Sequence, residues 1–242
     1  MNVQPSVLVV DDGSDSAELV ALWAGGLARD RGARLLKAPP SARSATVLDI
    51  ASKQEVHWLV SGLRFRANPS IPDVDDELAT LMRRAPCPLW TVQPWAASAA
   101  PSFSVGVVGV NSSTEARAAA HAAAGLLRRS RSLGRLILVH GTEDHPAQMA
   151  AGRPWPEIVA SMQIERHRWI ERLARELADP ALIVEVVIRP VWAPDLIGGM
   201  ARCRDADFTA LGSGWRTEGS EIRASRLVRC LVRATPCPML IV

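Results

Sequence analysis

Arginines near the carboxyl end of the sequence have the spacing that best suits a binding site. Arg226 stands at the predicted start of a helix, where the helix dipole disfavours a cation unless an anion joins it. Arg216 and Arg223 could reach the same place, and guanidinium groups bind anions through paired hydrogen bonds. The same side chains could instead pair with Glu218 and Glu221, or form a solvated helix face. The sequence is therefore compatible with two interpretations of these arginines: an anion-binding site and a solvated basic helix face.

Catalytic chemistry has no comparable signal. Lys37 and Lys53 are the only lysines, and neither lies in a glycine-rich phosphate loop, which argues against phosphoryl-transfer and Schiff-base enzymes. The sequence contains no G-x-S-x-G nucleophile motif. Four side chains that could bind a metal are clustered in one predicted loop: His140, Glu143, Asp144 and His145. Polar residues after a strand are common, however, so we expect no metal there. We therefore expect a protein that is not an enzyme.

Composition restricts the class of partner. The 242 residues are 48% hydrophobic and 22% charged with a net charge of +3, which is typical of a globular protein and gives no general attraction to nucleic acid. One basic run is better explained as the complement of a helix carboxyl end: Arg128, Arg129, Arg131 and Arg135. No signal peptide, membrane span or disulfide framework is evident. We expect a cytoplasmic protein that binds neither nucleic acid nor membrane.

An internal repeat indicates which elements position these residues. HWLVSGLRFR, from His57, is echoed by DFTALGSGWR from Asp207, and Pro-Cys-Pro around Cys87 returns around Cys237, all at an offset of 150. VLVVDDGS, from Val7, is echoed by VGVVGVNSS at an offset near 99, so the first copy is shorter by 150 − 99 = 51 residues. The sequence predicts a truncated domain over residues 1–98 and a complete one over 99–242.

Each copy alternates short apolar runs with helical patterns, which predicts a parallel α/β sheet. The second copy has a long amphipathic helix, Glu157–Leu177, followed by a third strand that the first copy lacks. We therefore expect that one αβ unit is missing from the first copy. The predicted strands are Val7–Val10, Leu35–Lys37, Leu59–Val60, Leu89–Val92, Val105–Val110, Leu136–His140, Leu182–Ile188, Phe208–Leu211 and Met239–Val242.

The whole chain resembles a tandem member of the universal stress protein family. The resemblance rests on a first strand that ends in V-D-D-G-S and on a late strand that is followed by Gly212-Ser213-Gly214. It also rests on helices that lead into A-P-C-P and T-P-C-P before the last strand of each copy. It implies two Rossmann-like parallel-sheet domains with strand order 3-2-1-4-5, the first lacking one αβ unit. It also implies dimerisation, either between two chains or within this one as an intramolecular pseudo-dimer.

Many members of this family bind ATP through G-x2-G-x9-G-[ST], and here the pattern is degenerate. After Gly212 the second glycine is replaced by Trp215, and Ser225-Arg226 stands where Gly-Ser belongs; a register through Gly214 breaks the later spacing. The first copy has Gly62, Phe65 and an acidic Asp75-Asp76, which would repel phosphate. The resemblance implies these site positions in the second copy: Asn111, Ser112 and Val139 for base and ribose, and Gly212, Ser213, Gly214, Arg216, Ser225 and Arg226 for phosphate.

Two functional hypotheses follow. The first is a non-enzymatic regulatory or binding module of the stress response, with a decayed ATP motif, no cofactor and a protein partner. The second is a nucleotide-binding protein with weak ATPase activity that uses only the second domain, where ATP or another small anion would bind. A response-regulator receiver is a weaker alternative: Asp11 and Asp12 follow the first strand, but no lysine follows a later strand and the repeat stays unexplained.

Overall fold

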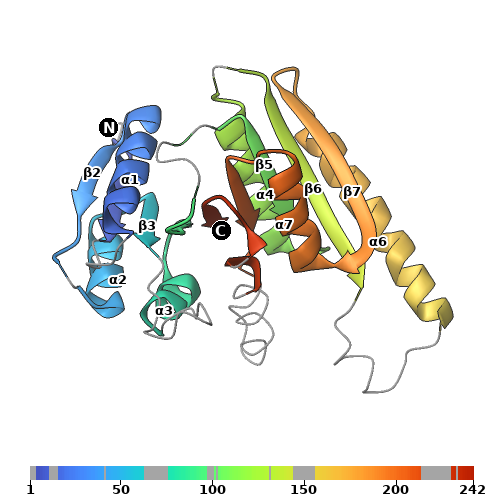
Figure 1. The fold of residues 1–242 in the computed structure, drawn as a ribbon, viewed down its shortest axis with the longest axis horizontal. Coiled ribbons are helices and arrows are strands. Elements are labelled where there is room, and N and C mark those ends of the chain that lie inside the picture. The colour runs from blue at the N-terminus through green and yellow to red at the C-terminus, as the bar shows by residue number, and fades with distance from the viewer. Residues whose placement is uncertain are drawn as a thin grey trace.

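The computed structural model describes residues 4–10, 16–40, 42–62, 76–96, 101, 103–130, 132–143, 156–213, 230–232 and 234–242. These residues form a nine-stranded sheet with helices on both faces (Figure 1). The elements of the first part are β1 (Ser6–Val10), α1 (Ala17–Arg31), β2 (Arg34–Lys37), α2 (Ser44–Lys53), β3 (Trp58–Gly62), α3 (Asp76–Arg84) and β4 (Leu89–Val92).

The second part contains the longer strands and the longest helix of the described chain. Its elements are β5 (Val105–Gly109), α4 (Thr114–Leu127), β6 (Gly134–Glu143), α6 (Pro156–Leu177), β7 (Leu182–Trp192), α7 (Ala193–Cys203), β8 (Phe208–Leu211) and β9 (Met239–Ile241). Residues 230–232 and 234 are helical; the first three lie within the helix that the sequence predicts over Ser225–Arg233, and residue 234 lies just beyond it. Two strands run beyond their predicted ends: β6 continues to Glu143, and β7 continues to Trp192.

The sheet order is β2-β1-β3-β4-β9-β8-β5-β6-β7. Read from β7 inward to β9, the second part has the order 3-2-1-4-5 that was predicted, with β7 as its third strand. The described residues of the first part have the same order without that strand, so β2 forms the outer edge there, and the predicted loss of one αβ unit is confirmed for these residues. Backbone geometry repeats as well: Glu55 and Asp205, which are 150 positions apart, have φ values of 48° and 47° before β3 and β8.

An antiparallel pair joins the two parts. β4 pairs with β9 so that Leu89 faces Ile241 and Trp90 faces Leu240. Strands within each part are parallel, whereas the two sets run in opposite directions at this junction. As a result, the carboxyl ends of the strands in the two parts lie at opposite edges of the sheet where they meet.

Apolar side chains fill both faces of the sheet. α1, α4 and α6 pack on one face, and α2, α3 and α7 pack on the other. At the junction, four buried aromatic rings come from both parts and from the connecting segment: Trp23, Trp90, Phe103 and Phe208. The β4–β9 junction is therefore a continuation of the core, because rings from both parts share one cluster.

Candidate functional site

The candidate site lies at the carboxyl ends of β5 and β8. The chain leaves β5 toward β6 on one side, while β8 lies on the other side, so these neighbouring strands flank a topological switch point. Parallel α/β sheets bind ligands at such points, next to the amino terminus of the helix that follows the first strand. Here that helix is α4, and the residues around it include Asn111, Ser112 and Gly212.

The amino terminus of α4 is capped by the protein itself. The Ser113 hydroxyl accepts a hydrogen bond from the Ala116 N–H at 3.1 Å, and the Asn111 Oδ1 accepts one from the Ser113 N–H at 3.0 Å. Ser112 is exposed between them. Donors that could bind an anion in an uncapped helix are thus used to shape the loop. The predicted ligand residues Asn111 and Ser112 do lie at the switch point, but the Asn111 oxygen already has a partner.

A carboxylate lies in the first turn of the same helix. The pKa of Glu115 is lowered because its carboxylate accepts a hydrogen bond from its own backbone N–H, with further hydrogen bonds from the Thr114 and Ser113 hydroxyls. The side chain is therefore ionised at neutral pH and complements the helix dipole. Glu115 and Ser113 were not among the site residues predicted from the sequence. The only sequence signal for them is Ser-Thr-Glu ahead of an alanine-rich helix, which marks the start of that helix.

Gly212 brings the end of β8 directly against α4. A Cβ built at Gly212 would collide with backbone atoms of Glu115 and Ala116, so only glycine permits this approach. The next residue, Ser213, is buried and its N–H donates to the Val242 carbonyl at 2.7 Å. These two residues lie where the motif predicts phosphate contacts, but the close packing and the Ser213 hydrogen bond join β8 to α4 and to the chain end.

Val139 and His140 lie within β6, beside the end of β5, and support the loop after β5. The Val139 side chain is buried in the core, and its carbonyl accepts a hydrogen bond from the Val110 N–H at 2.9 Å. The buried His140 ring lies with Nδ1 2.8 Å from the Val110 carbonyl, which can only accept, so Nδ1 carries the proton. The Val139 side chain therefore faces the core and not the strand ends, so a ligand there would meet its backbone.

The remaining predicted contacts lie outside the described residues: Gly214, Arg216, Ser225 and Arg226, together with Arg223. Asp144 and His145 of the polar loop lie outside as well. Within the described ranges, no group of three or more His, Cys, Asp or Glu side chains could hold a metal ion. In the same ranges, every helix is too short or too polar to cross a membrane.

The fold and the switch point define a Rossmann-like α/β protein. The model of the universal stress protein family matches residues 106–242. Because this match covers more than half of the sequence, the chain belongs to the universal stress protein family.

Solved structures agree with this fold along the whole chain. A universal stress protein from Archaeoglobus fulgidus DSM 4304 is similar with a TM-score of 0.64 and 11% identity, covering 98% of this chain and 95% of that one. A functionally unknown protein from Pseudomonas aeruginosa PAO1 has a TM-score of 0.58 and 17% identity, covering 99% and 82%. At these identities the likeness shows the fold alone. No curated protein matches the chain in sequence.

Proposed function

We propose that this chain is a tandem universal stress protein, with a truncated domain over residues 1–98 and a complete one over 99–242. It works as a non-enzymatic regulatory module of the cytoplasmic stress response and acts by docking a protein partner. Its nucleotide site is degenerate. The repeat at 150 residues and the matching strand orders support the tandem arrangement.

The observation that carries the loss of nucleotide binding is the state of the α4 amino terminus. A phosphate there would need free N–H groups and a positive local field. Instead, the Ala116 N–H donates to Ser113, the Ser113 N–H donates to Asn111, and the Glu115 carboxylate adds a negative charge. Like charges repel one another, so the Glu115 carboxylate at this terminus opposes a polyphosphate.

A calorimetric titration with ATP and Mg²⁺ tests the proposal. We expect no heat of binding from the wild-type protein, and no nucleotide by mass spectrometry after purification. The variant Glu115→Gln removes the charge and keeps the side-chain shape, so any affinity it gains over the wild type measures how strongly Glu115 opposes phosphate.

Micromolar binding by the wild type would contradict the proposal. If that binding disappeared in Arg226→Glu, the second hypothesis would replace it: a nucleotide-binding protein that uses the second domain. Phosphate release from bound ATP, measured on the same sample, would then decide whether this domain has ATPase activity.

A further inference from the structure

The two outer edges of the sheet, β2 and β7, differ sharply. β2 has four residues, Arg34–Lys37, with a cation at each end. β7 has eleven residues, Leu182–Trp192, and no described strand pairs with its outer edge. Ile183 and Val186 on β7 are 44% and 36% exposed. A long apolar edge strand is an unusual feature in a stable monomer, because its backbone groups can pair with another chain.

The backbone of β7 presents alternate residues to that edge. The Ala181 carbonyl accepts from the Gly134 N–H on β6, and the Thr142 hydroxyl donates to the Arg189 carbonyl. Odd-numbered residues therefore direct their backbone groups inward to β6. Since N–H and C=O groups alternate in direction along a strand, the even-numbered residues Val184, Val186 and Ile188 direct theirs to the outer edge.

The sequence of β7 is complementary to itself. In an antiparallel pair of two β7 strands centred on Val187, Glu185 lies opposite Arg189 of the second copy, and Arg189 lies opposite Glu185. Val186 and Ile188 then exchange N–H···O bonds with each other across the axis, because both direct their backbone groups outward. Moving the centre by one residue in either direction separates Glu185 from Arg189. The charges therefore select a single register.

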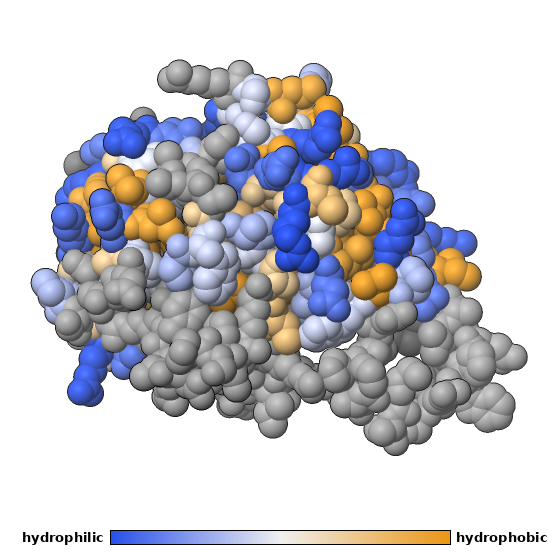
Figure 2. Space-filling view, in the orientation of Figure 1, coloured by the Kyte–Doolittle hydropathy of each residue, from blue (hydrophilic) through white to orange (hydrophobic). Residues whose placement is uncertain are grey.

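The two charged groups are placed to use that register. Glu185 is 31% exposed, and its Oε1 lies 2.6 Å from Arg204 at the end of α7. Arg189 is exposed and has no carboxylate partner among the described residues. An incoming Arg189 would extend the existing Arg204–Glu185 pair into a network of three charges. Figure 2 shows apolar residues reaching the surface on the side of the molecule where β6 and β7 lie in Figure 1.

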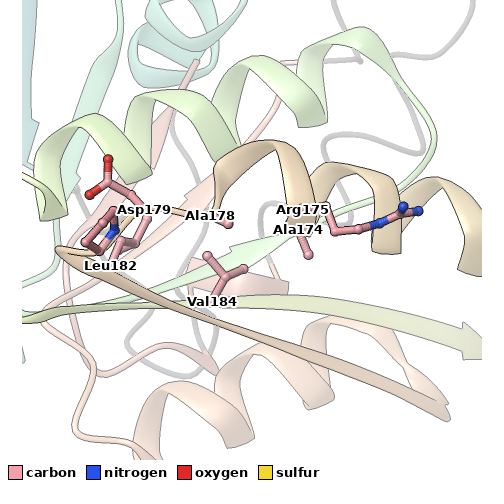
Figure 3. A pocket seen from close by; sticks show the side chains of 7 residues that line it. Ala174, Arg175, Ala178, Asp179, Leu182 and Val184 are labelled. Atoms are coloured by element: carbon pink, nitrogen blue, oxygen red, sulfur yellow. The ribbon is translucent and has the colours of Figure 1, made fainter.

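A hollow beside β7 gives the second copy room. It has a volume of about 570 Å³ and lies between the carboxyl end of α6 and the beginning of β7 (Figure 3). Its walls include the small residues Ala174 and Ala178 and the apolar Val184. In the register centred on Val187, Pro190 of the second copy lies opposite Val184, on the side of the sheet that α6 covers. A proline ring there would cover part of this hollow.

Pro190 also limits the pairing. It has no N–H, so the Val184–Pro190 pair makes one hydrogen bond where two are usual. In addition, the register of β6 and β7 is irregular near this end, between Gly141 and Glu143. The Leu182 N–H already donates to the Asp179 carbonyl, so both ends of β7 are protected while Ile183–Arg189 stays open. β2 has no open segment of this kind, because full-length self-pairing would bring Arg34 opposite Lys37 of the other copy.

We propose that β7 is the homodimerisation edge of this protein, where two copies pair antiparallel about Val187 and extend the sheet from one chain into the next. This surface lies at the opposite end of the sheet from β2 and does not depend on the state of the nucleotide site.

Sedimentation velocity of the full chain tests the proposal. At about 100 μM we expect the wild type to sediment as a dimer of the 26.1 kDa chain. Arg189→Glu places two glutamates opposite each other and should return the protein to a monomer. Val186→Pro removes an outward N–H, whereas Val186→Ala keeps it, so the proline variant alone should be monomeric. Leu35→Pro on β2 is the matched control at the other edge and should stay dimeric.

Cysteine substitution tests the register. Val187→Cys places two thiols next to each other across the axis in a pair without hydrogen bonds, so mild oxidation should give a covalent dimer. Ile183→Cys should give no crosslink beyond that of the wild type. Circular dichroism and thermal melts confirm that each variant is folded. Any one of three results would overturn the proposal. These are a monomeric wild type, a dimer that persists in both Arg189→Glu and Val186→Pro, and crosslinking by Ile183→Cys without crosslinking by Val187→Cys.

Discussion

Replacing Trp90 tests whether the two parts of the chain share one core. The Trp90 ring is fully buried on β4 and lies 5.3 Å from the Trp23 ring and 5.6 Å from the Phe208 ring, measured between centroids. Removing a buried tryptophan side chain costs about 3–5 kcal/mol, because its apolar contacts are lost and a cavity remains. We therefore expect Trp90→Ala to lower the free energy of unfolding by this amount.

The conservative variant Trp90→Phe provides the comparison. It loses about 1–2 kcal/mol of packing. The Trp90 indole N–H, however, has no acceptor among the described residues, and a buried unsatisfied donor costs about 1–3 kcal/mol. Phenylalanine removes that donor while keeping a ring beside Phe208. The two effects offset one another, so we expect Trp90→Phe to stay within about 1 kcal/mol of the wild type.

Urea denaturation followed by circular dichroism gives both free energies. Hydrogen exchange read by mass spectrometry then reports β1 in the first part and β6 in the second part separately. If the parts share one core, Trp90→Ala should lower the protection of both strands together. The reasoning would be refuted if Trp90→Ala lowered the hydrogen-exchange protection of β1 and left that of β6 normal. It would also be refuted if Trp90→Ala and Trp90→Phe lowered the free energy of unfolding equally.

Three further results are expected. Gly212→Ala should lower the melting temperature, because its Cβ would collide with the α4 backbone, whereas Gly199→Ala, which has open space around it, should leave that temperature unchanged or raise it. Ser113→Ala should cost about 1 kcal/mol in thermal unfolding through loss of the α4 cap. Burial raises the pKa of Cys237 to about 12, so at pH 8 a thiol reagent should modify the exposed Cys203 and leave Cys237 intact until the protein unfolds.

The sequence was informative wherever the repeat could be aligned. The offset of 150 predicts that β3 and β8 are equivalent, and the positive φ angles of Glu55 and Asp205 confirm it in the backbone. The described residues of the first part contain no counterpart of β7, as the sequence predicts, and the 51-residue difference in length corresponds to α6, β7 and their connections. Local patterns and self-similarity are sufficient for these inferences.

The junction and the detail of the site could not be predicted in the same way. The pairing of Trp90 with Leu240 joins strands that are 150 positions apart, and no local pattern specifies which edges meet. Glu115 has no signal beyond that of a helix start, and its effect on the site depends on how closely Gly212 approaches it. Both features are set by tertiary packing, which a single sequence does not reveal.

The β4–β9 pairing has a consequence for how the protein responds to its own abundance. Two separate domains would meet at such a seam by association, and dilution would separate them. Here both strands belong to one chain, so the seam forms at an effective concentration that does not change with expression level. A cell that makes more of this protein therefore increases the number of chains in which β4 is already paired with β9. The equilibrium between paired and unpaired β4 and β9 does not change with the concentration of the protein.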